Sequence, residues 1–205
     1  TEQKLESLFT KFRDKPMADL VNDKDALVVG RNVFVNNCAA CHGSDARGAK
    51  GFPNLADKDW LYGGDPDTVL TTVLGGRQGA MPALAAALPD GGVAQVANYV
   101  RSLSGLPHDA ALAAAGKPKF ETICAACHGL DGKGNQIVGA PNLTDDIWLY
   151  GGTLATIEET ITNGRNGKMP AWESLLGKDR ARLVAAWVVA QSQTGGADAA
   201  PVAAK

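Results

Sequence analysis

The pattern Cys-x-x-Cys-His occurs twice in the chain, at residues 38–42 and 124–128. These motifs contain all four cysteines of the 205 residues, so none is left for a separate disulfide framework. Two cysteines at this spacing can form thioethers to the two vinyl groups of one haem, and the adjacent histidine can bind the iron. Each motif therefore predicts one covalently attached haem c, and the predicted attachment residues are Cys38, Cys41, His42, Cys124, Cys127 and His128.

Paired cysteines also occur in redox dithiols and in zinc sites. A thioredoxin-like dithiol needs no following histidine. Zinc modules usually bring their cysteine pairs closer than the 83 residues (124 − 41) that separate Cys41 from Cys124. The repetition of the complete motif therefore favours two haems.

The sequence contains an internal repeat. The two haem motifs are related by an offset of 86 residues (124 − 38). An offset of 88 (141 − 53) superimposes Pro-Asn-Leu at 53–55 on 141–143, and the same offset relates Trp-Leu-Tyr-Gly-Gly at 60–64 to 148–152. The two additional residues fall in the Gly-rich segment 131–139, as expected of an insertion in a loop.

Two of the three methionines occupy matched Met-Pro positions, Met81 and Met169. They follow the haem histidines by 39 (81 − 42) and 41 (169 − 128) residues, and we predict that they are the sixth iron ligands. The competing interpretation is that they fill the core, but a gap-filling residue has no reason to recur before proline at a fixed position. The spacing leaves open whether each methionine serves the haem of its own repeat or of the other.

Hydrophobic periodicity predicts three helices in each repeat and an all-α class. A first helix is expected to run into the cysteines, a middle helix to end at glycine, and a closing helix to end the repeat. No segment shows sustained strand alternation. The predicted ranges are about 25–37, 67–74 and 93–100 in the first repeat, and about 113–123, 156–163 and 182–189 in the second.

The helices and turn signals divide the chain into four parts. We interpret residues 1–24 as a linker or docking segment, because they are polar with a short amphipathic stretch around Leu5, Leu8, Phe9 and Phe12. Cytochrome domains are predicted at 25–105 and 106–192, with the boundary at the Gly-Leu-Pro of 105–107. The Gly/Ala/Pro-rich residues 193–205 are expected to form a flexible tail.

Several other residues recur at fixed distances from the haem motifs. Gly30 and Gly116 suggest close helix crossings, with Phe34, Phe120, Tyr99 and Trp187 packed beside them. Arg77 and Arg165 stand four residues before the methionines, where a guanidinium could pair with a haem propionate or remain solvated. Trp60 and Trp148 could line a haem edge, although simple core burial also explains them.

Charge and hydropathy exclude other classes of protein. The chain has 20 Lys and Arg against 22 Asp and Glu, with no block of like charge, so it lacks the basic surface typical of nucleic-acid binding. No stretch approaches the 18 or more apolar residues of a membrane span. Thr1 is an unusual natural start, and we expect a signal sequence or membrane anchor to have preceded it.

With these residues placed, the chain resembles two class I cytochrome c domains in tandem over about residues 25–192. Lys-Gly-Phe-Pro-Asn-Leu at 50–55 with Asp-Trp-Leu-Tyr-Gly-Gly at 59–64, and their counterparts at 139–143 and 146–151, are similar to the dihaem subunit III of cbb3-type cytochrome c oxidases. The resemblance implies a periplasmic subunit, held to the bacterial inner membrane by an N-terminal anchor. It also implies electron relay from a donor cytochrome c to the other oxidase subunits. The anchor is missing from this sequence, so a fragment of the subunit and a free-standing cytochrome are both expected alternatives.

We therefore expect an electron-transfer protein with two covalently bound haems, without catalytic residues and not an enzyme on its own. The first alternative is a diffusing periplasmic dihaem carrier. The second is a dihaem enzyme, which needs an open or displaceable iron site. Two matched Met-Pro positions argue against that enzyme.

Overall fold

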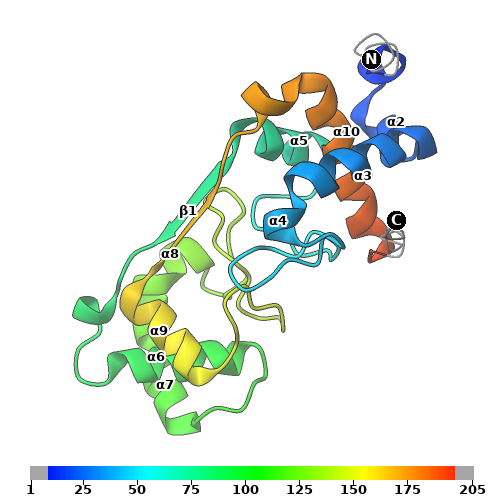
Figure 1. Ribbon diagram of the computed structural model, residues 1–205. Helices are drawn as coiled ribbons and strands as arrows, with labels where there is room; N and C mark the ends of the chain where they lie inside the picture. The colour runs from blue at the N-terminus through cyan, green and yellow to red at the C-terminus, as the bar shows by residue number, and fades with distance from the viewer. Residues whose placement is uncertain (1–8, 197–205) are drawn as a thin grey trace. The chain divides into compact units, whose positions relative to one another are not determined.

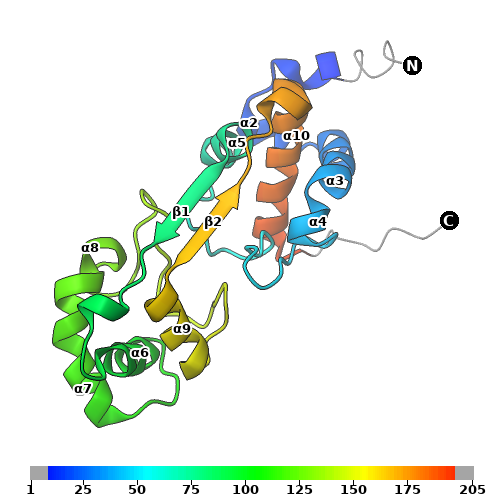
Figure 2. The same cartoon turned by 60° about the vertical axis from the view of Figure 1, so that its left-hand side comes forward.

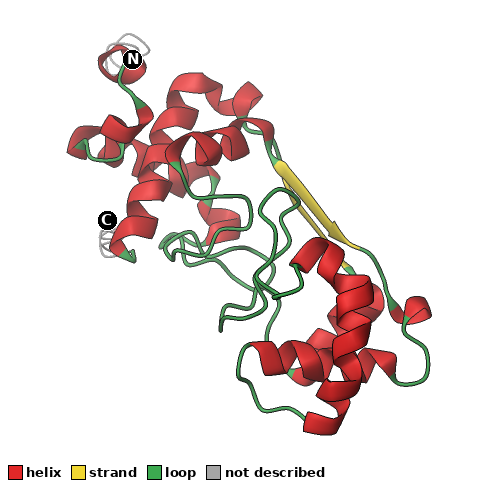
Figure 3. Cartoon of the chain, turned by 180° about the vertical axis from the view of Figure 1, so that it is seen from behind, coloured by secondary structure: helices red, strands yellow, loops and turns green. Residues whose placement is uncertain are grey.

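The computed structural model describes residues 9–196, and helices dominate this part of the chain (Figures 1 and 3). It confirms the helix-rich class and has a helix at every predicted range. The last helix begins at residue 173 rather than about 182, and the range 113–123 ends in a π-helix. Within residues 9–196, no helix is both long and apolar enough to cross a membrane. The helices that concern the sites are α3 (Lys24–Asn37), α4 (Ala39–His42), α5 (Pro66–Gly75), α6 (Gly92–Leu103), α7 (Ala110–Lys119), α8 (Ala125–His128), α9 (Leu154–Asn163) and α10 (Glu173–Thr194).

The chain forms two compact units, and neither is continuous in sequence. Among the described residues, unit 1 contains 9–59, 63–77 and 169–196, and unit 2 contains 60–62 and 78–168. The predicted boundary at 105/106 separates the sequence repeats but not these units. Each unit takes its haem motif from one repeat and the segment that begins near the Met-Pro from the other.

In unit 1, helix α3 of the first repeat packs against α10 of the second. Asp23 caps α3 by accepting hydrogen bonds from the backbone N–H groups of Asp25 and Ala26. Gly30 lies where a Cβ atom would collide with the backbone of Leu183, so only glycine permits this crossing. The rings of Phe34 and Trp187 pack beside it with centroids 4.5 Å apart. The predicted close crossing is confirmed, but its partner helix comes from the other repeat.

Unit 2 has the same arrangement, but here the second repeat supplies the haem motif and the first repeat supplies the closing helix. Helix α7 of the second repeat packs against α6 of the first. A Cβ atom at Gly116 would collide with the backbone of Gln95, and the rings of Tyr99 and Phe120 lie 5.2 Å apart. Helix α7 contains Pro118 and continues as a short π-helix, η2 (Phe120–Cys124), rather than as a regular α-helix up to the cysteine.

The all-α prediction needs one correction, a small two-stranded sheet of β1 (Arg77–Met81) and β2 (Arg165–Met169). Figure 2 draws the two strands side by side with their arrows in opposite directions. Both segments are short, polar and without alternating hydrophobic residues, so the sequence carries no strand signal. Each strand finds its partner only in the tertiary structure.

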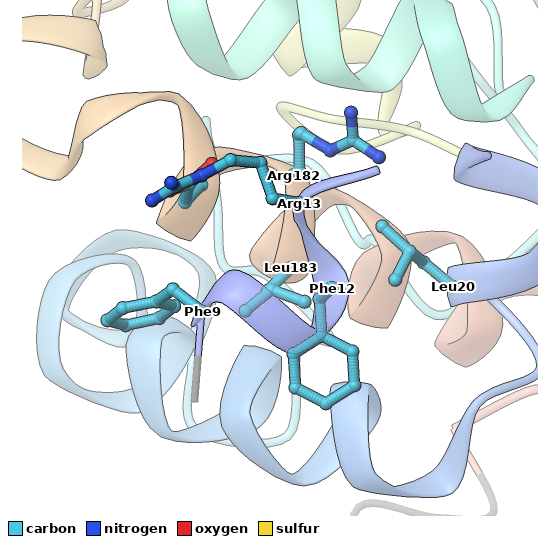
Figure 4. Close-up of a pocket in the computed structure, with 7 residues that line it drawn as sticks. Phe9, Phe12, Arg13, Leu20, Arg182 and Leu183 are labelled. Carbon is cyan, nitrogen blue, oxygen red and sulfur yellow. The ribbon is translucent and has the colours of Figure 1, made fainter. Parts of the chain in front are cut away.

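The described part of the N-terminal segment is folded onto unit 1. Residues 9–13 are helical, α2 spans Met17–Leu20, and the side chains of Phe9 and Phe12 are buried. They line a small pocket with Leu183 (Figure 4). Arg13 is paired with Asp179 of α10 at 2.8 Å. The docking role of this segment stays a prediction, and Leu5, Leu8 and residues 197–205 of the predicted tail lie outside the described residues.

Candidate functional site

The first Cys-x-x-Cys-His motif lies on the turn that follows α3. Cys38 ends α3, and α4 brings Cys41 and His42 around on one short turn. The His42 backbone N–H donates to the Cys38 carbonyl at 3.0 Å, and Gly43 ends α4 with a φ of 76°. The second motif has the same arrangement, since α8 ends at His128 and Gly129 has a φ of 78°. The local fold therefore presents two thiols and an imidazole from one turn, as covalent haem attachment requires.

Each motif histidine is oriented by the Pro-Asn-Leu segment of its own repeat. His42 Nδ1 lies 3.0 Å from the carbonyl oxygen of Pro53, and His128 Nδ1 lies 3.1 Å from that of Pro141. A carbonyl can only accept, so Nδ1 must carry the proton and donate it. The Nε2 lone pair of each ring is then available for a metal.

Burial keeps both imidazoles neutral. Desolvation lowers the pKa of His42 and of His128 below the ordinary value, and the hydrogen bonds to Pro53 and Pro141 offset only part of this effect. Neutral imidazole is the form that binds iron. The electrostatics and the tautomer of both rings therefore suit an axial ligand.

The loop after each histidine needs glycine to reach this position. Gly48 and Gly134 have positive φ values of 71° and 82°. A Cβ atom at Gly48 would collide with the backbone of Pro53, and one at Gly134 with that of Pro141. Gly48 also donates its N–H to the His42 carbonyl at 2.8 Å. Glycine thus allows the proline carbonyl to approach the imidazole.

The two cysteines of each pair differ in exposure. Cys41 and Cys127 are exposed, whereas Cys124 is buried and Cys38 is half-buried. Burial raises the pKa of Cys38 and of Cys124 to about 11. Such thiols are poor redox nucleophiles at neutral pH, because the thiolate is the reactive form. This argues against Cys38 and Cys124 as redox nucleophiles.

The donor set fits haem better than a bare metal ion. Among residues 9–196, no group of three or more His, Cys, Asp or Glu side chains could hold an ion. A zinc site of the usual four protein ligands therefore has no candidate in this part of the chain. One imidazole and two thiols on a single turn match the needs of a covalently attached macrocycle instead.

Met81 and Met169 are half-buried at the ends of β1 and β2. Met81 belongs to unit 2, where it packs against the hydrophobic core that contains Phe120 and Cys124. Met169 belongs to unit 1, which also contains His42. The structure therefore gives each unit one motif histidine and one of the two matched methionines.

The two arginines are fixed by matching hydrogen bonds. Arg77 Nε donates to Thr72 Oγ1 of α5, and Arg165 Nε donates to Thr160 Oγ1 of α9, both at 2.9 Å. Arg77 lies in unit 1 and Arg165 in unit 2. Each arginine thus stays in the unit of its own repeat's haem motif, whereas the methionine four residues later does not.

Among the described residues of unit 2, three buried side-chain donors are unpaired. One is Arg101 Nε, and the other two belong to residues predicted to lie at a haem. Trp148 Nε1 and Arg165 Nη2 are buried and find no acceptor within the described chain. Buried donors in native proteins are nearly always paired, so a ligand acceptor is expected here. Haem propionates are carboxylates and supply such acceptors. Trp60 also lies in unit 2, where its carbonyl accepts a hydrogen bond from Gln136 at 3.1 Å.

Comparison with known proteins assigns the family. The family described as cytochrome c oxidase, cbb3-type, subunit III matches residues 25–100 and 111–188. The chain belongs to this family. Membership implies haem c as the cofactor, in agreement with the donor set above.

Curated relatives carry the same family name. The chain is 50% identical over 189 residues to the cbb3-type cytochrome c oxidase subunit CcoP of Rubrivivax gelatinosus, covering 91% of this chain and 62% of the relative. It is 50% identical over 187 residues to the subunit FixP of Bradyrhizobium sp. (strain ORS 278), covering 84% and 64%. The chain therefore spans somewhat less than two thirds of the length of these relatives.

Sequence reasoning missed the role of the Pro-Asn-Leu segments. Their recurrence at a fixed offset marked them as important, but a backbone acceptor cannot be recognised from residue type. Asn54 and Asn142 explain the rest of the motif, because their side chains accept the N–H groups of Ala56 and Thr144 at 2.8 and 3.0 Å. These turns fix the loop that carries the proline carbonyl.

Proposed function

We propose that this chain is a dihaem electron relay, the haem-bearing part of a cbb3-type oxidase subunit III. The observation that carries the proposal is the duplicated histidine geometry, in which Nδ1 donates to a proline carbonyl and Nε2 is free. Histidines that bind metals usually donate their other ring N–H to such an acceptor, and here the same hydrogen bond occurs in both repeats. Haem iron supplies the one-electron chemistry by alternating between its ferric and ferrous states.

The cofactors are two covalent haems c, and the chain supplies every ligand. The cysteine pairs of the two motifs provide the thioethers, His42 and His128 the proximal ligands, and Met81 and Met169 the distal ligands. A thioether is a soft, neutral donor that favours ferrous iron and raises the potential. We further propose that Arg77, Arg165, Trp60 and Trp148 contact the propionates or haem edges, which would pair the buried Trp148 and Arg165 donors.

Filled coordination favours relay over catalysis. An enzyme or a gas sensor needs an open iron position, but each unit holds a methionine as well as a histidine. Neither iron then needs to bind substrate, and no residue is proposed as catalytic. The chain is an electron-transfer subunit and is not an enzyme on its own.

We propose the other oxidase subunits as acceptors and a soluble cytochrome c as donor, because the relatives are named as subunits of that oxidase. We place the haem domains in the periplasm, since c-type haem is attached outside the bacterial cytoplasm. The full-length subunit is proposed to be anchored in the inner membrane through a segment before residue 1. The docked residues 9–20 would then fix unit 1 close to that segment.

The first test is a haem count with spectra of the purified protein. A pyridine haemochrome assay should give two covalent haems per chain, and the oxidised protein should show the near-infrared sulfur-to-iron band of His/Met ligation. Carbon monoxide should leave the reduced spectrum unchanged at neutral pH. One haem per chain, or a high-spin spectrum that responds to carbon monoxide, would support the enzyme alternative and overturn the relay.

A second test separates an oxidase subunit from a diffusing carrier. The full-length gene product should remain in the membrane fraction and copurify with an oxygen-reducing complex. A full-length product recovered entirely in the soluble periplasmic fraction would retain the dihaem relay but transfer it to a free-standing carrier.

A further inference from the structure

The Arg165 side chain in unit 2 is held by three contacts of different kinds. Its Nε donates to Thr160 Oγ1 at 2.9 Å, and its Nη1 donates to Glu159 Oε1 at 3.1 Å. Its Cζ atom lies 4.5 Å from the centroid of the Tyr150 ring. A guanidinium is planar and rigid, so these contacts fix its orientation. The remaining nitrogen, Nη2, is buried and has no acceptor within the described part of the chain.

The segment that carries Tyr150 also packs beside the second haem motif. Trp148, two residues before Tyr150, contacts the hydrophobic core that includes Cys124. Trp148 Nε1 is a further buried donor without an acceptor in the described chain. Buried donors are nearly always paired in native proteins, so Trp148 Nε1 and Arg165 Nη2 are both available to a haem propionate. Whatever fixes Arg165 therefore influences the charge around this haem.

The two repeats differ at the position of Glu159. The hydrogen bond from the arginine Nε to a threonine occurs in both repeats. The offset of 88 relates Glu159 to Thr71 (159 − 71), which carries no charge. The Thr71 hydroxyl donates to the Asp67 carbonyl of its own helix at 2.9 Å. The second repeat thus adds a carboxylate to an arginine–threonine pair that both repeats share.

We propose that Glu159 is a positioning residue for the second haem and acts through Arg165. Its carboxylate accepts from Nη1 and so holds the guanidinium in the orientation that leaves Nη2 for a haem propionate. Its negative charge also offsets part of the positive charge of Arg165. This inference rests on the proposed dihaem function and adds a residue that sets the potential of the haem attached at Cys124 and Cys127.

The two actions of Glu159 change the potential in opposite directions. A negative charge stabilises the ferric state, so its removal should raise the potential. An arginine bonded to a propionate stabilises the ferrous state, so the loss of its orientation should lower the potential. Glu159→Gln removes the charge but keeps an acceptor oxygen for Nη1. Glu159→Thr removes both and introduces the residue of the first repeat. The two variants therefore separate the charge from the positioning.

The test is a redox titration of the full haem-loaded chain followed by NMR. Haem methyl signals, assigned through contacts to the side chain of Cys38 or Cys124, report each haem separately. At a fixed applied potential, Glu159→Gln should lower the oxidised-to-reduced ratio of the second haem about two- to fivefold, since the charge is half-exposed. Glu159→Thr should lower it by less, and the first haem should keep its ratio in both variants. Glu158→Gln is the matched control, because it removes the same charge from a neighbouring residue of α9 that is not bonded to Arg165, and its effect should be smaller.

The ¹⁵N signals of the Arg165 guanidinium supply a second measurement. A guanidinium held at Nη1 rotates slowly, so its Nη signals should stay separate in the unsubstituted protein and in Glu159→Gln but merge in Glu159→Thr. A change of ratio in Glu159→Thr as large as that in Glu159→Gln would overturn the positioning role. An unchanged ratio in both variants would overturn the whole inference while leaving the dihaem relay intact. Absence of a haem at Cys124 in the unsubstituted protein would overturn both.

Discussion

The two units reach the same histidine–carbonyl geometry by different helices. In unit 1, α3 is a continuous α-helix up to Cys38, whereas in unit 2 Pro118 stands near the end of α7 and the π-helix η2 follows. Pro118 has no N–H to donate to the carbonyl of Ala114, which disfavours a regular helix at this position. Nevertheless Phe34 and Phe120 are both fully buried, and both histidines donate to proline carbonyls.

The comparison shows which features define the site. Asp23 and Asp109 cap α3 and α7 with the same pair of hydrogen bonds, so the starts of both helices are equivalent. The glycine crossings at Gly30 and Gly116 are also equivalent. The type of helix between the glycine and the haem cysteines can vary. The close helix crossing fixes the start of this segment, and the histidine–carbonyl hydrogen bond fixes its end.

The largest expected effect on stability comes from adding a side chain at a glycine where two helices cross closely. Gly30→Ala should destabilise unit 1, and Gly116→Ala unit 2, by about 1–3 kcal/mol, because the new Cβ overlaps a backbone carbonyl. Hydrogen exchange should show lost protection in α3 and α10 for the first variant and in α6 and α7 for the second. Gly75→Ala, where no atom lies within 4 Å, is the matched control and should change stability by about 1 kcal/mol or less. Lost protection in α6 on substituting Gly30 would contradict the exchanged pairing.

Removal of one methionine should affect one haem only. Met169→Leu should halve the near-infrared band and lower one of two potentials by on the order of 0.1 V, since axial ligands set haem potentials over about 0.8 V. A spectroelectrochemical titration measures both changes. Met81→Leu should give the same result at the other haem, whereas Met17→Leu should leave both potentials in place. Equal shifts of both potentials in one variant would argue against independent sites.

The arginines should have a smaller effect on potential. If Arg165 pairs with a propionate, Arg165→Gln should stabilise the oxidised state of one haem three- to tenfold, equivalent to a fall of about 30–60 mV. Arg77→Gln should act on the other haem, because the two arginines lie in different units. An unchanged titration curve for both variants would indicate solvated arginines.

The helix caps of α5 and α9 should show the smallest effect and a difference in pH dependence. Asp65→Ala and Thr153→Ala should each cost ~1 kcal/mol, because both side chains accept an N–H at the helix start. Hydrogen bonds from Thr68 lower the pKa of Asp65 below its ordinary value of 3.8.

The Asp65 contribution should therefore be complete above pH 3.8 and decline as the pH falls through the lowered pKa. The Thr153 contribution should not vary with pH, because a hydroxyl does not titrate in this range. Denaturant unfolding at neutral pH and at about pH 3 checks this difference. A cap at Asp65 that keeps its full contribution at the lower pH would contradict the assigned pKa direction.

The sequence predicts the local parts of this molecule well. The haem motifs, the two Met-Pro positions and six helices follow from spacing and periodicity. The middle helices end at Gly76 and Gly164, which have positive φ values. These features depend on residues close in sequence, so their signals survive without knowledge of the fold.

The sequence does not reveal that each haem motif packs against the closing helix of the other repeat, and the reason is specific. Leu183 and Gln95, the partners of Gly30 and Gly116, are themselves related by the offset of 88 (183 − 95). Trp187 and Tyr99 are related in the same way (187 − 99). Gly30 could therefore pack on either closing helix with similar contacts, and only the tertiary structure distinguishes them. The strands β1 and β2 were missed because neither five-residue segment shows alternating hydrophobic residues.

Met81 shares unit 2 with His128, and Met169 shares unit 1 with His42. The near-infrared spectrum of chains that carry a single haem therefore tests directly which methionine serves which iron. With Cys38 and Cys41 both replaced by serine, only the haem at Cys124 and Cys127 remains attached, and its band reports one iron. In this background we predict that Met81→Leu abolishes the sulfur-to-iron band and that Met169→Leu retains it. A band that survives the loss of Met81 and disappears with Met169 would contradict the account.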